Sequence, residues 1–137
     1  MKKINVVFAT DNYYIQHLAT TLTSMLVNTQ YADQIIVNII DGGIDDKNKR
    51  YLSRLTNKYQ SDIKFLKIDH NVFKNAVVNG HITVASYYRI IIATLFETDV
   101  NKAIYLDSDL IIRHDIYEFW STDIGDYAVG AIKINEY

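Results

Sequence analysis

The chain has 137 residues, a formal net charge of −2 and no cysteine. Its length fits one domain with a sizeable core, and the absence of cysteine excludes disulfides, thiolate metal sites and cysteine nucleophiles. Because the charge is balanced and no apolar run approaches the ~20 residues of a transmembrane helix, we expect no nucleic-acid partner and a cytoplasmic protein that at most touches the inner face of the membrane.

Apolar periodicity predicts alternating strands and helices. Short β-branched runs are typical of buried strands, and apolar residues three or four apart are typical of helices. In chain order we predict a strand over 4–8, a helix over 14–27, a strand over 34–40 and a turn at Asp41-Gly42-Gly43. A helix from Asp45 or Asp46 with an apolar stripe to Tyr59, a strand over 63–68, a loop over 69–81 and a helix capped by Thr83 with a stripe to Leu95 follow. The last predicted elements are strands over 100–106 and 110–112, a turn of helix over 116–120 and a strand over 127–132. This order predicts an α/β domain with a mostly parallel sheet flanked by helices.

Two carboxylates follow the predicted strand over 100–106. Open parallel sheets bind ligands outside the carboxyl ends of their strands. Asp107 and Asp109 are two residues apart, so in an extended segment both point the same way while Ser108 turns aside. Mn²⁺ and Mg²⁺ prefer such oxygen ligands and complete their shells with water and substrate phosphates. We therefore predict a divalent-metal site at Asp107 and Asp109, with a solvated turn as the alternative.

The segment after the first predicted strand, residues 9–14, has no glycine-rich phosphate motif. Asp11 can accept a hydrogen bond from a base edge and Tyr14 can stack on the base; alternatively, Asp11 caps the following helix and Tyr14 packs on it. Arg89 lies on an otherwise apolar predicted helix. Its side chain either extends to solvent or pairs with a carboxylate or phosphate.

Together these segments resemble glycosyltransferase family 8, a family of retaining enzymes. The likeness covers almost the whole chain and is carried by residues 7–14, 24–26, 40–44, 81–83, 88–89, 105–109, 120–124 and 129–131. The resemblance implies a GT-A, Rossmann-like fold and a UDP-glucose or UDP-galactose donor. It also implies that Asp107 and Asp109 hold Mn²⁺, or Mg²⁺, against the diphosphate of that donor.

The resemblance further implies roles for single residues. The implied donor contacts are Ala9 through its backbone, Thr10, Asp11 at the uracil, Asn12, Tyr14 on the base, Arg89 at the sugar or phosphate, and Ser108 against the nucleotide. Members of the family are longer, and their second part supplies a histidine metal ligand and much of the acceptor site. We therefore expect residues 1–137 to be one nucleotide-sugar-binding domain, a truncated GT-A sheet from a retaining hexosyltransferase that acts on a glycan, lipopolysaccharide or glycoprotein acceptor.

Two other functions stay open. Haloacid-dehalogenase-like phosphatases also place Asp-x-Asp after an apolar strand and use the first Asp as nucleophile, but their motif is usually near the N-terminus, and here it lies close to the end of the chain. The second alternative is a non-catalytic UDP-sugar-binding module whose carboxylates are vestigial. The sequence names no catalytic base, acceptor or oligomeric state.

Overall fold

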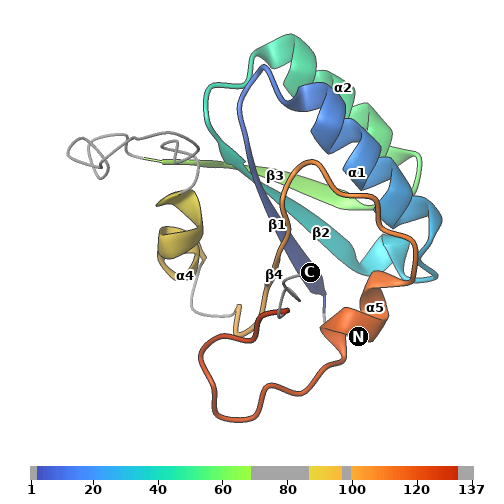
Figure 1. Cartoon of the computed structure of the whole chain (residues 1–137). Helices are drawn as coiled ribbons and strands as arrows, with labels where there is room; N and C mark the ends of the chain where they lie inside the picture. Colours follow the sequence, from blue (N-terminus) through green and yellow to red (C-terminus); the bar gives the residue numbers. More distant parts are fainter. Residues whose placement is uncertain (1–2, 69–86, 97–99, 133–137) are drawn as a thin grey trace, which may run out of the picture.

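The computed structural model of the chain describes residues 3–68, 87–96 and 100–132. Within these ranges, parallel strands form one sheet in the order β3-β2-β1-β4 (Figure 1). The strands are β1 (Ile4–Thr10), β2 (Ile35–Asp41), β3 (Asp62–Lys67) and β4 (Ile104–Tyr105). This sheet confirms the predicted α/β class and puts β1 between β2 and β4.

Helices cover both faces of the sheet (Figure 1). The helical elements are α1 (Ile15–Val27), η1 (Ala32–Gln34), α2 (Asp46–Asn57), η3 (Arg89–Ile91), α4 (Ile92–Leu95) and α5 (Ile116–Trp120). The long helices α1 and α2 pack on one face, and the short pair η3 and α4 packs on the other. Among the residues described, no helix has the length and apolar character needed to cross a membrane.

The core lies on the two faces of β1. Val6 and Phe8 are fully buried in a cluster with Leu22 of α1. Val7 points to the opposite face and packs with Tyr88, which directly precedes η3. Burial of an aliphatic or aromatic side chain stabilises a fold by about 1.5–3 kcal/mol. The central strand is therefore fixed from both sides, and its carboxyl end is a firm support for the loop that follows.

Most of the predicted elements are confirmed. The confirmed elements are the strands predicted over 4–8, 34–40 and 63–68, the helix over 14–27, the helix that begins at Asp46 with Asp45 as its N-cap, and the turn of helix over 116–120. The strand predicted over 100–106 is shorter and comprises Ile104–Tyr105. Thr83 and the loop predicted over 69–81 lie outside the described residues, and η3 and α4 form the described end of the third predicted helix.

The strand predicted over 110–112 is wrong. This apolar triplet is an irregular segment that runs along α1. Thr21 Oγ1 accepts from Leu110 N at 3.0 Å, Ser24 Oγ accepts from Ile112 N at 2.9 Å, and Asn28 Nδ2 donates to Ile112 O at 2.7 Å. Side chains three and four residues apart line one side of a helix, so α1 supplies the partners that a neighbouring strand would otherwise provide.

The strand predicted over 127–132 is also wrong. Its alternating apolar residues are exposed, with Tyr127, Val129 and Ile132 each more than three-quarters accessible to solvent. Tyr127 N instead donates to Ile124 O in a turn at 3.2 Å. A strand needs a neighbouring strand for its backbone groups, and none of the described strands pairs with this segment.

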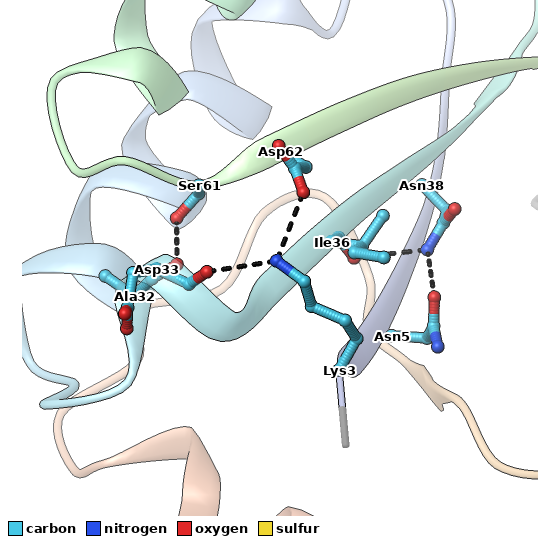
Figure 2. A network of polar contacts seen from close by, with 8 residues as sticks. All are labelled: Lys3, Asn5, Ala32, Asp33, Ile36, Asn38, Ser61 and Asp62. Carbon is cyan, nitrogen blue, oxygen red and sulfur yellow. Dashed lines mark hydrogen bonds and ion pairs between the residues drawn. The ribbon is translucent and has the colours of Figure 1, made fainter. Parts of the chain in front are cut away.

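The amino ends of the strands are joined by polar contacts (Figure 2). Lys3 Nζ lies 3.3 Å from Asp62 Oδ2, which links the start of β1 to the start of β3. Beside this ion pair, Asn38 Nδ2 donates to Asn5 Oδ1 at 3.2 Å, and both amides are buried (Figure 2). This hydrogen bond satisfies two polar groups that would otherwise be costly to bury. At the amino edge of the sheet, these polar side chains are therefore paired with one another. The exposed polar groups of the candidate site lie at the carboxyl edge.

Candidate functional site

Three segments come together at the carboxyl edge of the parallel sheet. We call them the β1 loop (residues 11–14), the β2 turn (residues 42–45) and the β4 loop (residues 106–109). Gly42 N donates to Thr10 O at 2.9 Å, and Ser108 Oγ donates to Ala9 O at 2.7 Å. Both neighbouring segments are therefore bound to the last residues of β1, at the edge where open α/β sheets bind ligands.

The β4 loop has a fixed backbone and free carboxylates. Ser108 is buried, and its carbonyl accepts from Thr21 Oγ1 at 2.9 Å. Asp107 and Asp109 on either side of it are exposed, and neither carboxylate has a hydrogen bond or ion pair with any residue that the structure describes. The loop therefore holds Ser108 inward and leaves the carboxylates of Asp107 and Asp109 open to solvent.

The β1 loop is ordered by Asp11. Its Oδ1 accepts from Tyr13 N at 2.9 Å and from Tyr14 N at 3.1 Å. α1 begins one residue later, with Tyr14 as its N-cap residue and no side-chain cap, so Asp11 shapes the turn that enters the helix. This is close to the capping alternative that the sequence left open, and a base contact through the other carboxylate oxygen stays a prediction.

Tyr14 and Tyr13 stand at the outer end of the same loop. The ring of Tyr14 lies 5.0 Å from that of His17, centroid to centroid, and about half of the residue is exposed. Tyr13 is 91% exposed. Tyr14 thus packs on α1 while one side of it stays accessible, which is compatible with the predicted stacking on a base.

Asn12 is bound to the beginning of α2. Its Nδ2 donates to Asp45 Oδ2 at 3.0 Å, and its Oδ1 accepts from Asp45 N at 3.1 Å and from Asn48 Nδ2 at 2.8 Å. Asp45 Oδ1 at the same time caps α2 by accepting from Asn48 N at 2.7 Å. The hydrogen bond from Asn48 N, followed by that from Asn12, lowers the pKa of Asp45 below its usual value.

Asp41, the last residue of β2, is the anchor of the β2 turn. Its Oδ1 accepts from Gly43 N at 3.0 Å and Ile44 N at 2.7 Å, and its Oδ2 lies 2.5 Å from Lys49 Nζ on α2. Burial of Asp41 acts to raise its pKa, but the hydrogen bonds from Ile44 N, Lys49 and Gly43 N outweigh it, so the pKa is lowered. The carboxylate therefore stays ionised and holds the turn to α2.

Tyr88 connects η3 to the same edge. It is buried beside Ile40 and Val7, and burial, followed by the negative charges of Asp11 and Asp41, raises its pKa. The beginning of η3 is therefore close enough to Asp11 and Asp41 for their negative charges to act on Tyr88. Arg89 is the next residue; its backbone starts η3, and its side chain lies outside what the structure describes.

Among the described residues, no group of three or more His, Asp or Glu side chains is placed to hold a metal ion. Asp107 and Asp109 nevertheless fit a divalent cation in their chemistry, because they are exposed hard oxygen donors without a competing partner among the residues that the structure describes. A cation bound by two carboxylates takes its other ligands from water and phosphate oxygens. The donor set therefore suits a cation that arrives with a diphosphate.

A groove on the described surface lies elsewhere. It has a volume of about 800 Å³ and runs between α1 and α2, with Ala19 and Tyr51 on its walls. Lys47 and Arg54 are its only charged lining residues. Asp107 and Asp109 do not line it, although Asn48, which donates to Asn12, does.

Sequence reasoning missed three contacts at the edge. Thr21 was not singled out, although a threonine fully buried in α1 had to find a partner. The bridge from Asn12 to Asp45 joins segments 33 residues apart and leaves no local pattern. The Asp-Gly-Gly signal predicted the β2 turn but not its tight contact with β1, where a Cβ on Gly42 would lie 2.8 Å from Thr10 O.

The chain is similar to several glycosyltransferases. It is 36% identical over 131 residues to general stress protein A of Bacillus subtilis, covering 95% of this chain and 46% of that protein. It is 28% identical over 131 residues to a lipopolysaccharide 1,2-glucosyltransferase of Escherichia coli, covering 96% of this chain and 38% of that protein. The chain therefore spans less than half the length of these relatives.

A solved structure matches the fold closely. The galactosyltransferase LgtC, crystallised with donor and acceptor sugar analogs, superposes with a TM-score of 0.78 at 26% identity, covering 90% of this chain and 44% of that one. The parallel sheet and this likeness define the GT-A class of glycosyltransferase folds, as the sequence predicted. The profile described as Glycosyl transferase family 8 matches residues 5–137, and the chain belongs to that family. Membership leaves the phosphatase alternative without support.

Proposed function

We propose that this chain is the donor-binding domain, over residues 1–137, of a retaining hexosyltransferase that uses UDP-glucose or UDP-galactose and a divalent cation. The observation that carries the proposal is the β4 loop, where Ser108 is bound to β1 and Asp107 and Asp109 have no partner among the described residues. Unpaired neighbouring carboxylates repel each other. A cation that also binds a diphosphate relieves that repulsion.

The other edge residues suit the nucleotide part of the donor. The β1 loop offers the accessible side of Tyr14 for stacking and the remaining oxygen of Asp11 for the uracil. Ala9 and Thr10 are proposed to lie against the donor through their backbone. Both carbonyls are already hydrogen-bonded within the protein, so this part of the backbone is fixed before the donor binds. Arg89, by its place at the beginning of η3, is proposed to contact the sugar or phosphate.

The chemistry proposed for the whole enzyme is transfer of a hexose to a hydroxyl acceptor, such as a glycan, lipopolysaccharide or glycoprotein, with retention at the anomeric carbon. When bound, Mn²⁺ or Mg²⁺ supplies Lewis-acid stabilisation of the departing UDP. Asp107 and Asp109 would hold that cation and, through it, the diphosphate, and the β1 loop would orient the nucleoside. The cysteine-free sequence suits a cytoplasmic location, which is part of the proposal.

Calorimetric titration of UDP with and without Mn²⁺ tests this function. We expect UDP binding to require the metal. It should weaken by at least about tenfold in Asp109→Ala, because this variant removes one of the two proposed carboxylate ligands and so lowers the affinity for the metal. Asp126→Ala removes another exposed carboxylate outside the three edge segments and should bind UDP like the wild type. Binding that persists in EDTA and in Asp109→Ala would overturn the metal site, and no UDP binding at any metal concentration would overturn the donor site.

A non-catalytic UDP-sugar-binding module is the second candidate. It is favoured by the lack of a three-ligand metal group among the described residues. Metal-dependent UDP binding without any hydrolysis of UDP-glucose or UDP-galactose would favour the module, and release of UDP from either sugar nucleotide would favour the enzyme.

A further inference from the structure

Asn12 stands out among the edge residues because its side chain is exposed and yet makes three hydrogen bonds within the protein. A carboxamide offers two acceptor positions and two donor hydrogens. Asn12 Oδ1 uses both acceptor positions, on Asp45 N and Asn48 Nδ2, and its Nδ2 donates one hydrogen to Asp45 Oδ2. An exposed polar side chain has water as an alternative partner, so three bonds to one neighbouring element indicate a specific role.

The partner side of this contact is rigid. Asp45 is the N-cap of α2 and is held by Asn48 N, while α2 is anchored in the core by Leu52, which is fully buried. The Asp41–Lys49 ion pair ties the same turn to the second turn of the helix. Asn12 is therefore attached to a part of the molecule that has little freedom to move.

The loop side of the contact is where order matters. Asn12 lies between Asp11 and Tyr14, the two residues proposed to meet the base, and Asp11 Oδ1 shapes the backbone on both sides of Tyr13. Loop segments that are ordered before a ligand arrives bind more tightly, because the ordering cost is already met in the free protein. A side chain that fixes this loop to α2 has such an effect without touching the ligand.

We propose that Asn12 is a positioning residue of the nucleotide-binding loop, which it holds in place through Asp45 and Asn48, and that its side chain does not contact the ribose. The inference rests on the proposed function and differs from the donor contact that the family resemblance implied for Asn12. It assigns the first turn of α2, which no sequence motif marked, to the support of the donor site.

Exchanging the two partners tests the proposal. Asn12→Asp places a carboxylate against Asp45 Oδ2, and Asp45→Asn places an amide against Asn12 Nδ2, so each single variant breaks the bridge. In Asn12→Asp/Asp45→Asn the new carboxylate at position 12 accepts from the new amide at position 45, from the backbone N–H of that residue and from Asn48 Nδ2. Asn and Asp cap helices equally well, and the double variant has the wild-type net charge.

We expect each single variant to bind UDP in the presence of Mn²⁺ about tenfold more weakly than the wild type, as supporting residues of a site commonly do. The double variant should recover to within about threefold of the wild type. Asn57→Asp, an exposed position at the far end of α2, controls for the added charge and should bind like the wild type. A double variant as weak as Asn12→Asp alone would show that Asn12 contacts the ligand directly and would overturn the proposal.

Amide hydrogen exchange at Tyr13 and Tyr14, measured without ligand, is an independent readout. Exchange should be faster in both single variants and return to the wild-type rate in the double variant; an unchanged rate in the single variants would overturn the bridge. A wild-type chain that does not bind UDP would instead overturn the proposed function. The exchange pattern would then decide separately whether Asn12 holds the loop.

Discussion

The β1 loop and the β4 loop lie side by side at the carboxyl edge and are built in opposite ways. In the β1 loop, the side chains of Asp11 and Asn12 are occupied by backbone groups and by α2. In the β4 loop, the backbone is anchored by Ser108 and Thr21, and the carboxylates of Asp107 and Asp109 have no partner in the described part of the chain.

This contrast separates two tasks. A surface that recognises a flat base gains affinity from being rigid beforehand. Carboxylates that bind a cation must instead be free of competing hydrogen bonds until the cation arrives. The edge therefore joins a segment whose polar side chains hold its own shape to one whose carboxylates have no partner among the described residues, as the proposed cation site requires.

The largest effect is expected where the β2 turn contacts the end of β1, which supports the β1 loop. Gly42→Ala would bring a Cβ within 2.8 Å of Thr10 O, and relief of such a clash with backbone costs about 3 kcal/mol of unfolding free energy. Urea unfolding measures it. Gly125→Ala is the matched control. The φ of Gly125, +55°, is strained for a residue with a side chain, but no described atom lies within 4 Å of the added Cβ. The substitution should therefore cost about 1 kcal/mol of unfolding free energy. A loss in Gly42→Ala no larger than this would mean that the contact between the β2 turn and β1 is loose.

Thr21→Val tests the anchoring of the β4 loop. The valine keeps the shape of the buried side chain but leaves Leu110 N and the carbonyls of Ser108 and Leu110 without the hydroxyl. We expect a loss of about 2 kcal/mol, since buried polar groups would be left unpaired. Thr20→Val removes an exposed hydroxyl that bonds only to Gln16 O of its own helix and should be nearly neutral. Equal effects in the two variants would contradict the anchoring role of Thr21.

Asp41→Asn weakens the β2 turn through charge. We expect a loss of about 1.5 kcal/mol at pH 7, because hydrogen bonds and an ion pair to a carboxylate exceed those to an amide. The pKa of Asp41 is lowered in the folded state from 3.8. Its stabilisation is therefore complete above about pH 3.8 and is lost as the pH falls through the lower folded-state value.

Unfolding free energies of the wild type and Asp41→Asn, compared from pH 7 to pH 2, check the sign of this effect. The difference between the two proteins should shrink only in the acid range. A difference that stays constant down to pH 2 would show that the charge of Asp41 does not hold the turn.

The smallest effects are expected for the carboxylates of the β4 loop in the absence of metal. Asp107→Asn and Asp109→Asn should each change the unfolding free energy by less than about 0.5 kcal/mol, as exposed side chains without partners do. Thermal unfolding in EDTA measures this. A loss above about 1 kcal/mol in either variant would mean that the carboxylate has a structural partner, and the contrast between the two loops would fail.

The elements that were predicted correctly have a strong periodicity of apolar residues or a clear turn signal at their ends. β1, α1, β2 and α2 were predicted because their apolar patterns are long and Asp41-Gly42-Gly43 marks the turn between β2 and α2. The segment over 110–112 was assigned wrongly because three apolar residues indicate a strand only if a strand lies beside them. Here the neighbour is a helix, and the polar series Thr21, Ser24 and Asn28 on α1 was the available signal.

For the site, the sequence and the family resemblance indicated which residues gather at the edge, and the structure describes how most of them are held. Ala9, Asp11, Ser108 and the two carboxylates do lie on neighbouring segments. Asp11 shapes its own loop through residues two and three positions along the chain, close to the capping alternative. The attachment of Asn12 to α2 depends on where segments 33 residues apart meet, which local patterns do not encode. Their contacts with a donor stay predictions.

The hydrogen bond from Ser108 Oγ to Ala9 O spans 99 residues of sequence. Contacts of such long range slow folding, because a large loop must close before the contact stabilises anything. At about 5–20 residues per second of synthesis, the edge of β1 waits roughly 5–20 s for β4 to emerge from the ribosome. The carboxyl edge is therefore completed only after β4 has been synthesised, and the strand edge that β4 will fill is open to wrong pairing until then.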